Sequence, residues 1–351
     1  MPRALTLVLL TGFLTLAAQA APTAPGPATA PATQPQKELP DLHWSQLFHR
    51  GDHILFVGDD ITQQMYYDRA ATAALLAVMP DRNLRFFNGG KDGATARSAQ
   101  KWIGGLLDLT RPQIVFIMFG LNDGVDPAAG RDPVGSYARA LTALVQKVRA
   151  YAGVRQVIIL SPPAVQPGLN ARLDGLGYND VLRKLAQTAR QVAIDQHVGF
   201  IGLFEYTHFV FDAASKDQGE SLSWDGRLPN DMGHVIIASV ILRGLGLTPK
   251  ELTPIAWEPL MARRMARIRT ALAIHLPAPS LEASEPIQAL FALLERYDEK
   301  FFRAWRIAGT FTGAPPRGLA LSLADGAWAQ VNEFVRHTYG AKKQMNPGHG
   351  P

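Results

Sequence analysis

Apolar runs alternate with amphipathic segments from His53 onward, and this alternation is the dominant pattern of the chain. The runs are continuously apolar and carry many β-branched residues, which is typical of strands buried on both faces of a parallel sheet. The pattern predicts five such strands, at residues 53–57, 84–88, 114–119, 156–160 and 199–204.

The segments between these runs have the apolar spacing of helices that cover a sheet. We expect helices at residues 62–78, 96–109, 133–151, 170–196 and 233–243, the last with Gly244 as its C-terminal stop. Together these elements predict a three-layer α/β/α domain of the flavodoxin-like, doubly wound type over residues 41–247. In such a fold the functional groups lie in loops at the carboxyl ends of the strands.

The strand pattern stops after residue 248, and helical periodicity replaces it. We therefore expect a helical C-terminal extension over residues 248–351, with helices near residues 254–273, 286–306 and 325–338. Phe301, Phe302 and Trp305 lie at helical spacing, and we interpret them as core packing against the main domain rather than as a ligand site. The sequence contains no internal repeat.

The N-terminus has the features of a secretory signal peptide. Arg3 supplies a positive charge, residues 4–17 are apolar, and Ala18-Gln19-Ala20 fits the small-x-small cleavage rule, so we expect cleavage after Ala20. An uncleaved anchor is the alternative, but the apolar run is short for a bilayer span. The mature protein would then be periplasmic or secreted, without a membrane span, and residues 21–40, rich in proline and alanine, would form a disordered linker.

Composition excludes several classes of protein. The 351 residues include no cysteine, so neither a disulfide framework nor a lipoprotein anchor is available. The net charge of +5 is modest, and the basic residues are scattered without interleaved aromatics, which argues against a nucleic-acid groove. A loose affinity for an acidic cell surface remains compatible with this charge.

Four short blocks carry the candidate chemistry, each at a boundary between predicted elements. They are residues 57–62 (VGDDIT), 88–95 (NGGKDGAT), 120–123 (GLND) and 225–234 (DGRLPNDMGH). A residue at a strand-to-helix turn, such as Asp60, is exposed above the sheet near the positive end of a helix dipole. Glycine, asparagine and aspartate are common in turns, so the four blocks are informative only because they occur together and in this order.

In this order the blocks resemble the motifs of the SGNH, or GDSL-like, hydrolases: Gly-Asp-Ser, a glycine block, Gly-x-Asn-Asp and Asp-x-x-His. The resemblance covers about residues 48–245. It implies the SGNH form of the α/β/α fold and ester hydrolysis, often of acetylated carbohydrates or lipids, by a serine, a histidine and an aspartate. Within it Gly93 and Asn122 match oxyanion-hole donors, and Asp225 matches the aspartate that orients the histidine.

Two positions depart from the family pattern. Asp60 stands where the resemblance places the serine, and Leu228 stands where it places the histidine. Serine-type acyl transfer needs a hydroxyl, an imidazole and oxyanion donors, and only the donors remain here. We interpret His234 as structural, Thr62 as a residue of the first helical turn and Ser223 as a loop residue.

Three interpretations of Asp60 stay open from the sequence. It can be an anionic cap at the helix N-terminus, paired with Arg227. It can face Asp225, so that two carboxylates perform acid-base chemistry on a sugar or hold a hard cation. It can also be a nucleophile, although no base for the second step is evident. Asp59 and Asp123 are expected to hold loops, and Lys91 and Asp92 to be solvated turn residues.

The leading functional hypothesis is an exported SGNH-like protein that lacks Ser-His-Asp catalysis and retains its cleft for a small-molecule ligand or a cell-surface glycan or acyl group. The alternatives are an active carbohydrate or lipid esterase, a carboxylate-based hydrolase using Asp60 and Asp225, or a scaffold whose C-terminal helices hold a partner. A histidine near Asp60, either His208 or His234, would favour an enzyme. We predict no cofactor and no resident metal, and the sequence does not indicate an oligomeric state.

Overall fold

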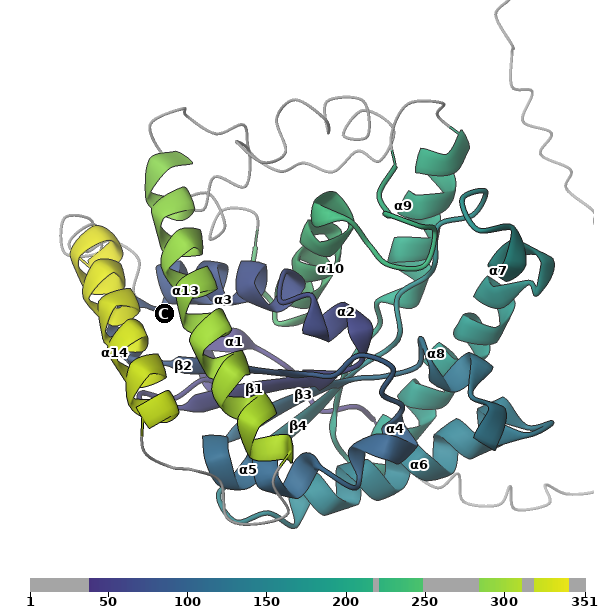
Figure 1. The fold of residues 1–351 in the computed structure, drawn as a ribbon, viewed down its shortest axis with the longest axis horizontal. Helices are drawn as coiled ribbons and strands as arrows, with labels where there is room; N and C mark the ends of the chain where they lie inside the picture. The colour runs from purple at the N-terminus through teal and green to yellow at the C-terminus, as the bar shows by residue number, and fades with distance from the viewer. Residues whose placement is uncertain (1–37, 217–220, 249–283, 311–318, 341–351) are drawn as a thin grey trace, which may run out of the picture. The chain divides into compact units, whose positions relative to one another are not determined.

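The computed structural model describes residues 38–216, 221–248, 284–310 and 319–340. Its centre is a five-stranded parallel sheet in the order β2-β1-β3-β4-β5 (Figure 1). The strands are β1 (His53–Gly58), β2 (Arg85–Gly90), β3 (Ile114–Met118), β4 (Gln156–Leu160) and β5 (Gly199–Ile201). This confirms the predicted fold class. The predicted signal peptide, most of the linker and the helix at residues 254–273 lie outside the described residues.

Helices cover both faces of the sheet, as expected for strands without a solvent-facing side. One face carries α4 (Ala96–Ala99), α5 (Ile103–Thr110), α6 (Pro133–Arg149) and α8 (Tyr178–Gln196), and the other carries α3 (Tyr67–Val78) and α10 (Asp231–Gly244). Shorter or peripheral helices are α1 (Trp44–Leu47), α2 (Asp60–Gln63), α7 (Ala171–Gly175) and α9 (Phe204–Lys216). Single turns of 3-10 helix occur between these elements, at η1 (Pro80–Arg82), η2 (Asp123–Val125) and η3 (Pro127–Ala129).

The central strands end together, and this positions the site. In the parallel register Gly58 of β1 lies beside Gly90 of β2 and Met118 of β3. The loops that leave these strand ends therefore meet at one edge of the sheet.

The core of the sheet contains aromatic as well as aliphatic side chains: the buried rings of Phe56 and Phe116 stack with centroids 4.8 Å apart.

The predicted helical region after residue 248 is present in its described parts. Helix α13 (Ser284–Thr310) packs beside α3 and against the edge strand β2, α14 (Leu319–Val335) packs on α13, and η5 (Arg336–Gly340) follows. Phe301 is buried, with its ring 5.1 Å from that of Phe87, which confirms the core-packing interpretation for this residue. An edge strand covered in this way cannot pair with another chain. The Trp305 side chain lies outside the described part.

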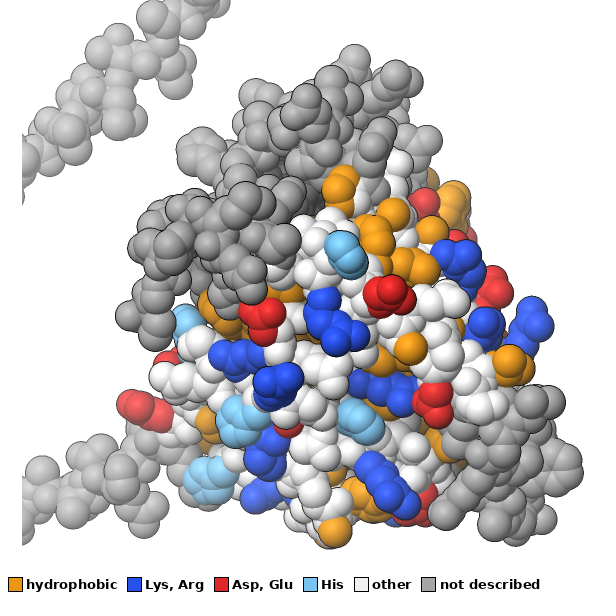
Figure 2. Space-filling view, turned by 90° about the vertical axis from the view of Figure 1, so that its left-hand side faces the viewer, with side chains coloured by type: hydrophobic (Ala, Val, Ile, Leu, Met, Phe, Trp, Pro, Cys, Tyr) orange, Lys and Arg blue, Asp and Glu red, His pale blue; other side chains and the backbone are white. Residues whose placement is uncertain are grey.

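Figure 2 shows Lys and Arg side chains interspersed with Asp and Glu on the face that it presents. Among the described helices, none is both long and apolar enough to span a lipid bilayer.

Candidate functional site

Asp60 is the first residue of α2, directly after β1. The preceding Asp59 caps this helix, because its side chain accepts a hydrogen bond from the Ile61 N–H at 3.1 Å. Asp59 is buried, and burial, together with the charge of Asp60, raises its pKa well above the usual range. Asp123 likewise accepts the Ala96 N–H at 3.0 Å. Both acids therefore hold loops in place, as the sequence predicted.

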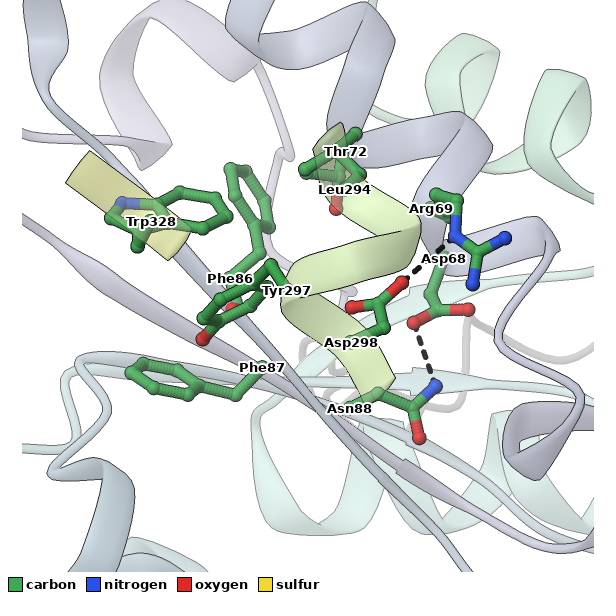
Figure 3. Close-up of a pocket in the computed structure, with 10 residues that line it drawn as sticks. All are labelled: Asp68, Arg69, Thr72, Phe86, Phe87, Asn88, Leu294, Tyr297, Asp298 and Trp328. Atoms are coloured by element: carbon green, nitrogen blue, oxygen red, sulfur yellow. Dashed lines mark hydrogen bonds and ion pairs between the residues drawn. The ribbon is translucent and has the colours of Figure 1, made fainter. Parts of the chain in front are cut away.

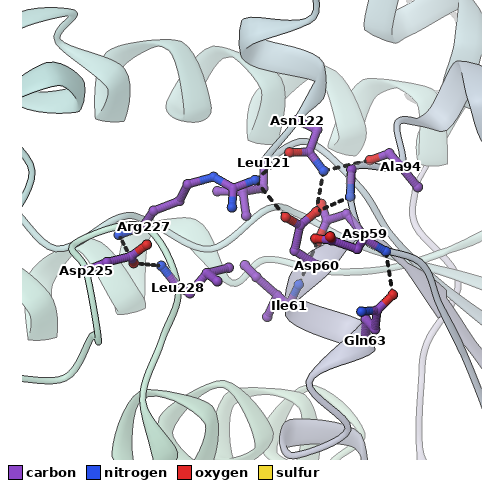
Figure 4. A network of polar contacts seen from close by, with 12 residues as sticks. Asp59, Asp60, Ile61, Gln63, Ala94, Leu121, Asn122, Asp225, Arg227 and Leu228 are labelled. Carbon is purple, nitrogen blue, oxygen red and sulfur yellow. Dashed lines mark hydrogen bonds and ion pairs between the residues drawn. The ribbon is translucent and has the colours of Figure 1, made fainter.

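The Asp60 carboxylate is held by donors from three separate loops (Figure 4). Its Oδ2 accepts the Gly93 N–H at 2.9 Å and the Asn122 Nδ2–H at 2.5 Å, and its Oδ1 accepts Arg227 Nη2–H at 2.9 Å. Asp60 is only 7% exposed, and the Arg227 side chain is 26% exposed. The structure thus bears out the predicted pairing of Asp60 with Arg227 at the helix N-terminus, whereas the residue that caps the helix is Asp59.

The environment keeps Asp60 ionised. Burial acts to raise its pKa, but hydrogen bonds from Asn122, Asp92 and Arg227, with the charge of Arg227, lower the pKa below the usual value. Asp92 behaves in the opposite way, because its hydrogen bond with the Asp60 carboxylate raises the Asp92 pKa. Asp92 is exposed, as predicted, but it is also a partner of Asp60.

Gly93 and Asn122 direct their donors at one atom, Asp60 Oδ2. Gly93 has a φ of +68°, a conformation that side chains other than glycine rarely adopt. Asn122 is fixed on both sides of its amide, since Nδ2 also donates to the Ala94 carbonyl at 2.9 Å and Oδ1 accepts Arg227 Nη2–H at 2.5 Å. The two donors that the resemblance assigns to an oxyanion hole are therefore occupied by a carboxylate of the same chain.

Asp225 and Leu228 do not contact the Asp60 carboxylate. Asp225 is exposed, and its Oδ1 accepts the backbone N–H groups of Arg227 at 2.9 Å and Leu228 at 2.7 Å. Figure 4 shows the Arg227 side chain extending from this loop to Asp60, whereas the Asp225 side chain stays within the loop. The proposed pair of facing carboxylates, Asp60 and Asp225, is therefore not formed; a guanidinium lies against Asp60 instead. No group of three or more acids and histidines suited to a metal ion occurs within the described ranges.

The remaining candidates for a base or nucleophile are engaged elsewhere. His234 is 2% exposed, its Nε2 bonds Gln64 Oε1 at 2.6 Å, and burial lowers its pKa to about 3. His208 stacks on Phe204, with ring centroids 5.5 Å apart. Thr62 Oγ1 bonds the Tyr67 hydroxyl at 2.9 Å, and Ser223 Oγ donates to the Leu228 carbonyl at 2.6 Å. These contacts agree with the structural roles predicted for His234, Thr62 and Ser223.

A family model described as the GDSL-like lipase/acylhydrolase family matches residues 56–236. The chain belongs to this family. The match includes the loops that carry Asp60, Gly93, Asn122 and Arg227, whereas α13 and α14 lie beyond it.

Proteins similar to this chain include an acetylxylan esterase from Geobacillus stearothermophilus, which is 25% identical over 222 residues, covering 56% of this chain and 94% of the relative. A crystal structure of a catalytic mutant of an acetylxylan esterase from the same organism gives a TM-score of 0.49 at 22% identity, covering 57% of this chain and 97% of the other. An alpha/beta hydrolase enzyme from the metagenome of Lake Arreo, Spain, gives 0.46 at 23% identity with the same coverage.

Proposed function

We propose that this chain is an exported member of the GDSL-like family that has lost serine-type ester hydrolysis and binds a glycan or acyl ligand at the surface around Asp60 and Arg227. The observation that carries the proposal is the position of the Asp60 carboxylate on Gly93 N–H and Asn122 Nδ2. In acyl transfer such donors must be free for the oxyanion that develops on the substrate.

Charge makes this arrangement unfavourable for ester hydrolysis. An ionised Asp60 would repel an oxyanion at the same donors, since like charges at short distance in a partly buried site interact strongly. A carboxylate that already accepts three hydrogen bonds is also a poor nucleophile, because those bonds stabilise its charge. Leu228 supplies no group that can take a proton.

The ligand class rests on the family and on the loop that carries Arg227. The named relative is an acetylxylan esterase, so an acetylated glycan is the first ligand to test. Trp224, directly before Asp225, is 68% exposed, so the loop that carries Arg227 also presents an exposed aromatic side chain. Arg227 remains partly exposed and presents further N–H donors.

The ligand proposal predicts binding without chemistry. Titration of the protein with acetylated xylo-oligosaccharide, followed by Trp fluorescence and calorimetry, should give saturable binding while the acetyl groups stay on the sugar. Trp224→Ala should weaken binding by at least about tenfold, the effect of losing one well-placed aromatic contact. Phe209→Ala, a second exposed aromatic residue, on α9 at 58% exposure, is the matched control and should bind like the wild type. Release of acetate, or the absence of binding, would contradict the proposal.

Export rests on the first 20 residues, whose charged, apolar and small-residue segments follow the order of a signal peptide. The expected mature N-terminus is Ala21. Mass spectrometry of the protein recovered from the periplasm or medium measures it directly, and an intact Met1 would contradict cleavage.

A further inference from the structure

A second buried polar cluster lies away from Asp60, where α3, β2 and α13 meet (Figure 3). Asp68 and Arg69 come from α3, Asn88 from β2 and Asp298 from α13. Arg69 Nε donates to Asp298 Oδ2 at 2.8 Å, and Asn88 Nδ2 donates to Asp68 Oδ2 at 2.7 Å. Asp68 and Asp298 are 4% and 8% exposed. The cluster therefore joins α13 to the α/β domain through side chains that are buried from solvent.

Negative charge exceeds positive charge in this cluster. Arg69 is the guanidinium that serves both buried carboxyls, and Asp68 Oδ1 is buried without a hydrogen-bond partner among the described residues. A cavity of about 10 Å³, lined by Asp68, Asn88 and Asp298 among others, lies between the helices and has room for at most one water. Glu295 also contacts Arg69, at 3.4 Å, but it is 60% exposed and its charge is screened by solvent.

The pKa values follow this imbalance. Burial raises the pKa of Asp68 to about 6, against the opposing effects of Asn88 and Arg69. Burial also raises the pKa of Asp298 to about 7; Arg69 opposes this shift, and the charge of Asp68 adds to it. A bound proton removes the excess charge at a lower cost than two ionised carboxylates in this space.

The other charged or titratable groups around the cluster do not offset this charge. Tyr67 on α3 and Tyr297 on α13 have pKa values raised by burial, and both stay neutral. Arg85 of β2 is paired with Asp325 of α14 at 2.5 Å. On the α10 side His234 is neutral. Tyr66 at the start of α3 and Asp231 of α10 also lie on this side, and burial together with the charge of Asp231 raises the pKa of Tyr66.

We propose that protonation of the buried Asp68 and Asp298 carboxyls holds α13 against α3 and β2, so that docking of α13 is tight in mildly acidic surroundings and loosens as the pH rises through neutrality. The sign follows from linkage, because groups whose folded pKa lies above the unfolded value stabilise the folded state at low pH and lose that effect as the pH passes the folded pKa. The device is independent of what the Asp60 site binds.

Asn88 connects the proton to the candidate site. The same Nδ2 that donates to Asp68 also donates to the Thr62 carbonyl at 2.7 Å, and Asn88 Oδ1 accepts the Gly90 N–H at 2.9 Å. Thr62 belongs to α2, the helix that Asp60 begins. Asn88 therefore links Asp68 to the turn that positions Asp60.

Hydrogen exchange of the full chain at about pH 5.5 and about pH 8, corrected for intrinsic exchange rates, tests the proposal. Local opening of α13 should increase about tenfold at the higher pH, the change expected for one proton with a pKa between 6 and 7. The amides of α6, on the opposite face of the sheet, serve as internal reference and should not change in step.

Asp68→Asn and Asp298→Asn should each reduce this pH dependence, because each removes one of the two buried groups whose pKa burial raises. Two variants are used in case one folds poorly. Glu299→Gln, an exposed acid next to Asp298, is the matched control and should keep the wild-type tenfold change. Exchange in α13 that is equal at both pH values in the wild type, or a change that persists undiminished in both asparagine variants, would overturn the proposal.

Discussion

Asp60→Ser combined with Leu228→His is expected to create hydrolysis of short activated acetyl esters, at least about a hundredfold above the wild type. The serine removes the carboxylate from Gly93 N–H and Asn122 Nδ2, and it places a hydroxyl at the start of α2. The histidine enters a loop position whose N–H is already bonded to the Asp225 carboxylate at 2.7 Å. Initial rates measured by release of the leaving group check this expectation.

Each single substitution should stay within a few-fold of the wild type, because the members of a triad act as a unit. Adding Asn122→Ala to the double variant should remove about a hundredfold of its activity if Asn122 donates to the oxyanion. Circular dichroism and the unfolding temperature establish that each variant is folded. A folded double variant no faster than its parents would show that Gly93 and Asn122 do not form an oxyanion hole.

Gly90→Ala is expected to lower the free energy of unfolding by about 3 kcal/mol or more, the upper range for overpacking against a rigid element. A Cβ at Gly90 would lie 2.2 Å from the Gln63 nitrogen and 2.4 Å from the Thr62 carbonyl carbon. Both atoms are backbone of α2, so no side-chain rotation relieves the contact. Denaturant unfolding of the variant measures the loss, and the Asp60 turn should be displaced with α2.

Gly105→Ala is the matched control for Gly90→Ala. Gly105 lies within α5, and a Cβ there meets no atom within 4 Å. Alanine should stabilise this helix by up to about 1 kcal/mol, because it loses less backbone entropy on folding than glycine does. Equal losses in the two variants would contradict the role assigned to the close approach of β2 and α2.

The strands could be predicted from the sequence because buried parallel strands are marked by continuous apolar runs. Their ends and the helix breaks were harder to predict. Met65 has a φ of +56° and separates α2 from α3, although nothing in a methionine indicates a left-handed turn. The fifth strand is shorter than predicted, since Ser161 Oγ accepts the N–H groups of Leu203 and Phe204 where α9 begins.

The site was predictable as a set of loops but not as a set of contacts. Strand order and family motifs place Asp60, Gly93 and Asn122 at one edge, and the structure joins them. The direction of the Arg227 side chain decides between ion pairing and a facing Asp225, and it depends on a loop 167 residues away from Asp60. The buried pair Asp68 and Asp298 belongs to elements with no shared sequence signal, so only the packing of α13 reveals it.

Whether Asp60 blocks serine-type hydrolysis is best measured by the rate at which the wild-type protein hydrolyses an activated acetyl ester, compared with the rate of Asn122→Ala. We expect equal rates for the two proteins, both indistinguishable from a heat-inactivated sample. A wild-type rate well above that background and lowered about a hundredfold by Asn122→Ala would contradict it, because the oxyanion donors would then be in catalytic use.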